Sequence, residues 1–204
     1  MTAQIEDVFC YRGREYAVAG TSEGEPFNPV LFGLRPAALW TLCWRGYQAV
    51  FGIVESRLVL DTLHVNLVPP GVNLVLPGEG YRRQEGPAIN GVAPHYLKGD
   101  LLFNNTYEGV NYHLEYTGGF LLAEGFIDDL YEHAGFQAAW KYERVVELLF
   151  DAGLLQQEFD RSEQIKEARR KILELWDENG SDRIPSADEI ARLAGGTFAR
   201  SYNL

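Results

Sequence analysis

Several segments of the chain alternate apolar and polar positions with the two-residue period of a β-strand that has one buried face. The clearest early example covers residues 41–55, and a turn at residues 55–56 leads into a return strand over residues 57–67. The return strand changes phase between Leu60 and Leu63, which predicts a bulge in this hairpin. The alternating apolar positions of the first strand are Tyr47, Ala49, Phe51 and Ile53.

Three further hairpins are predicted where aromatic and β-branched runs flank a glycine-containing turn. In the last of them, Asp151-Ala152-Gly153 supplies a turn that ends in a residue tolerant of positive φ. Between the second and third hairpins, residues 126–133 predict a short helix. The three hairpins pair residues 8–11 with 15–19, residues 110–116 with 120–123, and residues 141–150 with 154–159.

After Asp160 the apolar positions change to a helical period and form one stripe. A second helix is predicted from the capping box of Ser186 and Glu189. Because an isolated helix of this length is marginal in water, the stripe must be covered. We expect the sheet to cover it, since the linker at residues 160–161 is short, and a homodimer through helix 162–178 is the alternative. The stripe consists of Ile165, Ala168, Ile172, Leu175 and Trp176.

These patterns predict an α+β fold, in which a curled antiparallel β-meander or half-barrel is followed by a C-terminal helical pair. The expected division is a β-rich domain over residues 1–160 and a helical appendage over residues 161–204. Residues 69–100 are dense in proline and glycine and predict a long loop. Loops beyond about 12–15 residues without regular structure are often functional, although simple wrapping over the surface is the alternative.

One segment of the tail invites comparison with DNA-binding proteins. Residues 186–195 read SADEIARLAG and resemble the first helix and turn of a DNA-binding helix-turn-helix. The recognition helix would then lie in residues 197–204, where Arg200 is the only cation. That composition argues against DNA binding.

The chain is strongly acidic, with 29 Asp and Glu against 18 Lys and Arg and a formal net charge of −11. Nucleic acids and anionic membranes both require a positive surface, so we expect no membrane partner and regard nucleic acid as an unfavourable one. An acidic surface suits a basic protein partner instead, and solubility alone is the alternative explanation. The first residues contain no basic segment followed by an apolar run, which predicts a cytoplasmic protein.

No nucleotide-binding or hydrolase motif occurs in the sequence, so we predict no cofactor. The two cysteines, Cys10 and Cys43, have apolar neighbours and no metal-ligand spacing, which predicts buried, reduced thiols. Aromatic residues in and just before the strand of residues 41–55 could line a ligand cavity, although at strand spacing a place in the core is the more common role. These residues are Trp40, Trp44, Tyr47 and Phe51.

Two clusters are weak candidates for chemistry. In the long loop, His95 is a conceivable general base with Asp100 nearby, and Lys98 lies between them. In the short predicted helix, Asp129 and His133 would be one turn apart and could share a metal ion with Glu132. Acidic residues at the start of a helix and a histidine at its end also stabilise the helix dipole, which explains this cluster without a metal.

The sequence therefore supports two hypotheses about function. The first is a non-enzymatic acidic binding protein, such as a bacterial immunity protein or inhibitor that covers a basic protein partner. The second is a small-molecule-binding, β-barrel-like enzyme of the hydrolase class, with its site under the loop of residues 69–100. Charge and the absence of catalytic motifs favour the first hypothesis.

Overall fold

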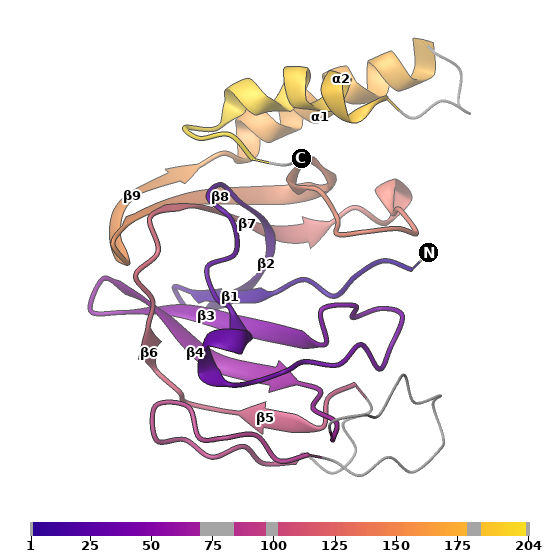
Figure 1. Ribbon diagram of the computed structural model, residues 1–204. Helices are drawn as coiled ribbons and strands as arrows, with labels where there is room; N and C mark the ends of the chain where they lie inside the picture. Colours follow the sequence, from indigo (N-terminus) through magenta and orange to yellow (C-terminus); the bar gives the residue numbers. More distant parts are fainter. Residues whose placement is uncertain (1, 70–83, 97–101, 179–184, 203–204) are drawn as a thin grey trace.

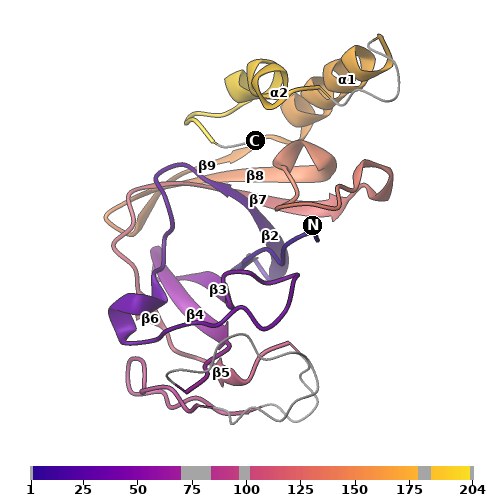
Figure 2. The same cartoon turned by 45° about the vertical axis from the view of Figure 1, so that its right-hand side comes forward.

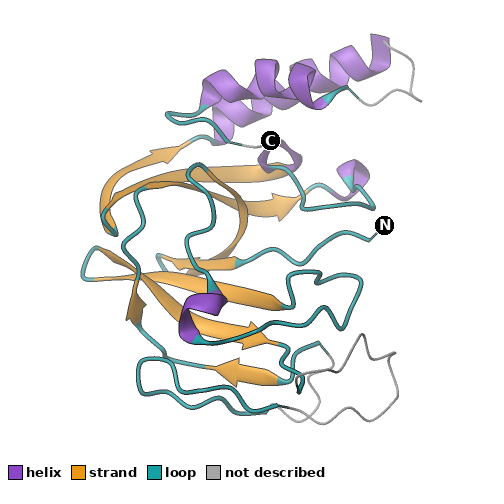
Figure 3. Ribbon diagram, viewed as in Figure 1, coloured by secondary structure: helices purple, strands orange, loops and turns teal. Residues whose placement is uncertain are grey.

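The computed structural model has the predicted α+β class, with a mixed, mostly antiparallel sheet followed by two helices (Figures 1 and 3). It describes residues 2–69, 84–96, 102–178 and 185–202. The strands are β1 Val8–Tyr11, β2 Arg14–Thr21, β3 Tyr47–Val54, β4 Arg57–Val65, β5 Asn105–Tyr107, β6 Tyr112–His113, β7 Gly118–Phe126, β8 Tyr142–Asp151 and β9 Leu154–Asp160. The helices are α1 Ser162–Glu178 and α2 Ala187–Ala194, and the short 3-10 helices are η1 Pro29–Phe32, η2 Asp128–Leu130, η3 Ala139–Lys141 and η4 Gly195–Thr197.

The sheet closes on itself. Its strand order is β3-β1-β2-β7-β8-β9-β4-β5, and β4 pairs with β3 as well as with β9. The pairing of β1 with β3 is parallel, whereas the other strand pairs are antiparallel. Figure 2 shows the resulting curl, with β2, β7, β8 and β9 arching over β3 and β4. The chain therefore forms a closed ring of strands, a step beyond the predicted meander or half-barrel.

The predicted bulge is present in the β3–β4 hairpin. Val50 pairs with Thr62, but the next residue, Phe51, pairs with Leu60, so Asp61 has no partner in β3. An extra residue of this kind shifts the side-chain phase of a strand. As a result Leu60 and Leu63, which are three positions apart, are both fully buried in the interior of the ring.

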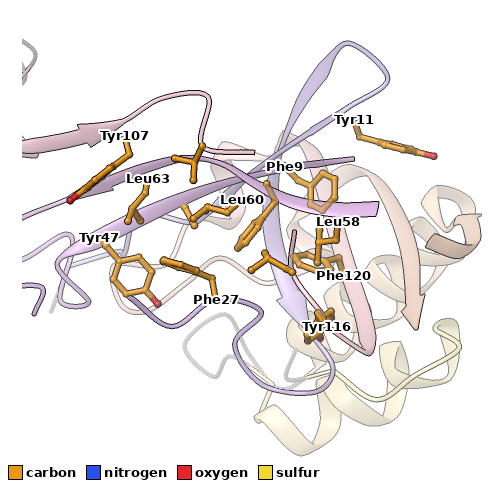
Figure 4. Packing of buried hydrophobic residues seen from close by; sticks show 14 of the residues in the cluster. Phe9, Tyr11, Phe27, Tyr47, Leu58, Leu60, Leu63, Tyr107, Tyr116 and Phe120 are labelled. Carbon is orange, nitrogen blue, oxygen red and sulfur yellow. The ribbon is translucent and has the colours of Figure 1, made fainter. Parts of the chain in front are cut away.

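Aromatic and aliphatic side chains from all sides of the ring fill its interior. Phe9, Phe51 and Phe120 make close ring contacts there, with centroids 5.2–6.3 Å apart. Figure 4 shows Phe9 and Phe120 close to Leu58 and Leu60, with Phe27 beside Tyr47 further along the same core. Such dense packing makes this cluster the main source of hydrophobic stabilisation.

Strand β7 is buried on both of its faces. Phe120 and Leu122 belong to the interior cluster, whereas Leu121 and Ala123 belong to a second cluster under the helices. This explains why residues 118–123 form an apolar run without alternation. Because β7 pairs with β2 on one side and β8 on the other, it fixes the place where the ring and the helical layer meet.

The helical tail docks on the outside of the sheet, as expected. Ile165, Ala168 and Ile172 are buried against the second cluster, and Figures 1 and 2 show both helices lying over β7, β8 and β9. Arg169 adds hydrogen bonds of 3.1 and 2.7 Å to the carbonyl groups of Trp140 and Tyr142. The remaining positions of the predicted stripe, Leu175 and Trp176, are only partly buried.

The start of the second helix is capped as predicted. The Ser186 hydroxyl accepts a hydrogen bond from the backbone N–H of Glu189, and the Glu189 carboxylate accepts one from the backbone N–H of Ser186. Beyond α2, only the 3-10 helix η4 follows, and residues 198–202 form no helix. The described part of the tail therefore has no recognition helix of the kind that the helix-turn-helix resemblance would require.

A buried glutamate holds both ends of the tail on the sheet. Glu147 of β8 is fully buried, and its carboxylate accepts hydrogen bonds from Arg161 at 2.8 Å and from the Tyr202 hydroxyl at 3.0 Å. The backbone N–H of Ala199 donates to the same carboxylate at 3.0 Å. Charge-assisted hydrogen bonds of this kind are strong, and each offsets part of the desolvation free energy of the buried carboxylate.

Two predicted elements are wrong. The hairpin of residues 110–116 with 120–123 does not form, because β6 pairs with β4 while β7 is enclosed between β2 and β8. The helix of residues 126–133 shortens to η2, and Tyr131 after it is extended. The Gln137 side chain bonds both backbone groups of Glu132, at 3.2 and 2.8 Å, which holds this segment out of a helix.

One of the two thiols also differs from expectation. Cys43 is buried, as predicted, but Cys10 is exposed even though it lies in β1. Its strand neighbours Phe9 and Tyr11 are the ones that face the interior, so the alternation of the strand turns Cys10 outwards.

In the part of the chain that the structure describes, none of the helices is long and apolar enough to span a membrane.

Truncating one buried isoleucine of α1 tests the docking of the tail. Ile172→Ala should lower the free energy of unfolding by about 2–5 kcal/mol, the range for a fully buried isoleucine. Urea denaturation measures this change, with the exposed Lys166→Ala as a control that stays within about 0.5 kcal/mol. Unchanged stability together with a shifted elution volume on a sizing column would contradict docking and favour the homodimer.

Candidate functional site

The first sequence candidate, His95, lies at the surface beside β5. Its Nε2 is 3.5 Å from a carboxylate oxygen of Glu108, and its backbone pairs with Thr106. Lys98 and Asp100, its suggested partners, lie outside the described residues. His95 lines none of the three principal cavities of the described structure. The described geometry therefore pairs His95 with Glu108.

The suggested metal ligands are held in other interactions. Glu132 forms an ion pair of 3.1 Å with the buried Lys141, and burial lowers the pKa of that lysine despite the pairing. Because η2 is only three residues long, Asp129 and His133 are not one turn apart on a helix. Within residues 2–69, 84–96, 102–178 and 185–202, no group of three His, Cys, Asp or Glu side chains is placed to hold a metal ion.

The cavity that best combines charged and aromatic groups lies at the junction of β2, β3 and the segment before η3. It has a volume of about 400 Å³, within the range of small-ligand sites. Two other cavities, of about 570 and 480 Å³, lie against the N-terminal segment and beside η1. The side chains that give the first cavity its chemistry are Asp7, Glu25, Phe27, Arg45, Tyr47 and Phe136.

An ion pair between Arg45 and Asp7 forms one wall of the cavity. Both terminal nitrogens of the Arg45 guanidinium donate to the Asp7 carboxylate, at 2.9 and 2.8 Å. Asp7 also accepts the backbone N–H of Ala49 at 2.8 Å, which fixes the carboxylate against β3. Burial alone would lower the pKa of Arg45, but the charge of Asp7 outweighs it and the pKa is raised. Arg45 is therefore held in place with its charge largely neutralised.

Aromatic rings enclose the guanidinium of Arg45. Its central carbon lies 4.7 Å from the ring centroid of Tyr47 and 5.2 Å from that of Phe136. Phe27 packs edge-on against Tyr47, with centroids 6.1 Å apart. A planar cation between ring faces is the arrangement favoured by cation–π attraction. The cavity thus already accommodates one guanidinium between aromatic walls.

A second carboxylate, that of Glu25, stands at the edge of the cavity. The Tyr47 hydroxyl donates to it at 3.4 Å, and Glu25 itself is exposed. Burial is the main cause that raises the pKa of Tyr47 above its ordinary value, and Glu25 adds to the effect. With Asp7 and Glu25 against Arg45, the formal charge of the cavity is two negative against one positive, or −1.

Two large aromatic side chains are exposed in segments that contribute to the cavity: Phe136 lines it, and Trp44 directly precedes the lining residue Arg45 in the chain. Phe136 is 47% exposed and Trp44 is 53% exposed. Gln4 connects the two segments, because its side-chain oxygen accepts from the Trp44 backbone while its own backbone N–H donates to Gly135. Exposed aromatic groups beside a cavity are typical of sites at which a partner is bound.

Sequence reasoning found part of this site. Of the four aromatics for which a core position was favoured over a cavity lining, Tyr47 and Phe51 belong to the interior cluster and also line this cavity. Trp40 and Trp44 do not line it. Sequence reasoning missed Asp7, Glu25 and Phe136, which come from separate segments of the chain. The available signal was Arg45, the only charged residue in the aromatic run of residues 40–47. A cation in such a run needs a buried acidic partner, which points to a polar site.

The arrangement suits binding better than catalysis. The Asp7 carboxylate already accepts three hydrogen bonds, and the raised pKa of Tyr47 keeps its hydroxyl protonated at neutral pH. Neither group is therefore available as a general base or a nucleophile. Comparison with known proteins adds no precedent, since no protein-family model, curated protein or solved structure matches the chain.

The raised pKa of Tyr47 predicts a loss of stability in alkali. The unfolded chain releases the tyrosine proton near pH 10, whereas the folded chain holds it to higher pH, so stability falls as pH rises beyond about 10. One such group contributes at most about 1.4 kcal/mol per pH unit. Tyr47→Phe should make this decline shallower by up to that amount, measured by urea denaturation between about pH 9 and pH 12. An equally steep decline in the variant would show that the Tyr47 hydroxyl does not hold its proton.

Proposed function

We propose that this protein is a non-enzymatic acidic binding protein that covers a basic protein partner. The observation that carries the proposal is the cavity at the β2–β3 junction, which has aromatic walls and a formal charge of −1. A bacterial immunity protein or inhibitor, acting in the cytoplasm on a toxin or nuclease, is the form of this function that we favour.

The exposed aromatic groups support an interface on this side of the molecule. Binding energy at protein interfaces concentrates in aromatic and arginine side chains that fill pockets in the partner. Phe136 presents such aromatic surface in the wall of a cavity that a partner side chain can enter, and Trp44 presents it next to Arg45 in the chain. The site thus offers both an anchor and a pocket.

The charge of the whole chain supports the nature of the partner. A net charge of −11 creates a negative field that attracts a basic protein and accelerates its association. The same field opposes nucleic acids and anionic membrane surfaces. A basic nuclease, including a toxin of that kind, has the complementary charge, because its nucleic-acid substrate is itself a polyanion.

The hydrolase hypothesis gains less support. It places its site around His95, Lys98 and Asp100, and Lys98 and Asp100 lie outside the described residues, so the comparison rests on His95. That histidine is partly exposed and pairs with Glu108.

Complex formation with basic proteins tests the proposal. We expect at least one member of a panel of basic nuclease and toxin domains to form a one-to-one complex on a sizing column, with loss of its activity. The complex should weaken about tenfold or more between about 0.1 M and about 1 M salt, as the screening length falls from roughly 10 to roughly 3 Å. Acidic proteins of similar size serve as controls. A panel without any complex at low salt, or complexes that are insensitive to salt, would contradict the proposal.

A further inference from the structure

We infer that the cavity at the β2–β3 junction is the socket for one guanidinium group, supplied by an arginine side chain of the basic partner. The inference rests on the proposed function and names the chemistry of its central contact. It follows from three observations: the negative charge of the cavity, the engagement of the Arg45 guanidinium by Asp7, and the exposed ring of Phe136.

Glu25 provides the acceptor for an incoming cation. Within the described residues, its carboxylate accepts only the long hydrogen bond, 3.4 Å, from the Tyr47 hydroxyl. A carboxylate has about four lone-pair positions and can accept two parallel N–H groups from one guanidinium. Glu25 lies in an exposed loop and lines the cavity, so an arginine head can reach it.

Phe136 provides the stacking surface. Its ring remains about half exposed although Arg45 packs over it at 5.2 Å. A planar guanidinium stacks on an aromatic face and is less strongly hydrated than an ammonium group. An arginine side chain therefore matches this wall of the cavity better than a lysine side chain does.

The Arg45 charge does not turn the cavity into an anion site. Both terminal nitrogens of its guanidinium donate to Asp7, so the forked end that would grip an anion is already engaged. An anion in the cavity would also face the Glu25 carboxylate and the negative field of the whole chain. The electrostatic balance therefore favours a cation.

The size of the cavity fits one long side chain. Its volume of about 400 Å³ lies near the lower end of the range for small-ligand sites, roughly 300–1,000 Å³. Such a cavity holds a single extended side chain and excludes a folded element such as a helix. The remainder of the interface must then lie on the surface around the cavity.

Titration with short peptides tests the socket directly. The probe is an acetylated and amidated peptide with one arginine between glycines, and matched peptides carry lysine or glutamate instead. In two-dimensional NMR spectra, the arginine peptide should shift the amide signals of Thr21, Phe136 and Gln137, which line the cavity. The lysine peptide should bind about threefold or more weakly, and the glutamate peptide should not bind. Equal binding of the glutamate peptide, or shifts confined to other surfaces, would overturn the inference.

Two variants separate the charge from the stacking surface. Glu25→Gln and Phe136→Ala should each weaken the arginine peptide about three- to tenfold, the effect of about 0.6–1.4 kcal/mol. The controls are Glu55→Gln, which removes the same charge from the exposed β3–β4 turn, and Tyr131→Ala, which removes an aromatic ring of similar exposure. Both controls lie outside the cavity and should leave the affinity unchanged. Controls that weaken binding as much as the cavity variants would overturn the inference.

The source of the guanidinium is tested with methylguanidinium alone. Because the backbone of a partner adds contacts around the mouth, the peptide should bind at least about threefold more tightly than this small cation. Equal affinity would indicate a small-molecule site and overturn the assignment to a protein side chain.

The same variants distinguish this inference from the proposed function. A basic protein that binds wild type, Glu25→Gln and Phe136→Ala equally well would leave the proposed function standing and overturn the socket. Arginine peptides that bind in the cavity, without any basic protein forming a complex, would support the guanidinium chemistry and contradict the proposed function.

Discussion

The burial of β7 on both faces is the constraint on which the rest of the structure depends. Phe120 and Leu122 require a core on one side, whereas Leu121 and Ala123 require a cover on the other. Closing the sheet into a ring satisfies the first requirement, and docking α1 satisfies the second. Two hydrophobic clusters therefore share one strand, so the helical tail and the sheet stabilise each other.

The buried carboxylate of Glu147 restricts the tail to one docked position on the sheet. Unpaired, this charge would cost several kcal/mol in an apolar layer, so the alternatives that leave it without partners are strongly disfavoured. Arg161 at the start of α1 and Tyr202 near the end of the chain must both reach it. The same principle operates at the cavity, where Asp7 fixes Arg45 between two rings and leaves Glu25 exposed at the edge.

Features that depend on neighbours in the sequence could be predicted, and features that depend on distant segments could not. The bulge follows from the phase change between Leu60 and Leu63, and the capped start of α2 follows from Ser186 and Glu189. The failed hairpin at residues 110–123 arose because strand pairing is decided by which faces are buried in three dimensions. The cavity could not be predicted for the same reason, since its residues Asp7 and Arg45 are 38 positions apart in the sequence.

The contact that closes the ring is also its weakest. β4 and β9 share one paired position, Arg57 with Leu154, flanked by the hydrogen bonds from Leu58 to Gly153 and from Leu155 to Ser56. Local opening proceeds most readily where few hydrogen bonds hold an element, so amide hydrogen exchange should be fastest along this contact among the ring strands. Such an opening lengthens an edge of β9 that pairs with β8 alone over most of its length, whereas β4 keeps β5 and β6 as neighbours. An open edge of this kind can pair with the same edge of a second molecule, which makes β9 the strand where misassembly between copies begins most readily.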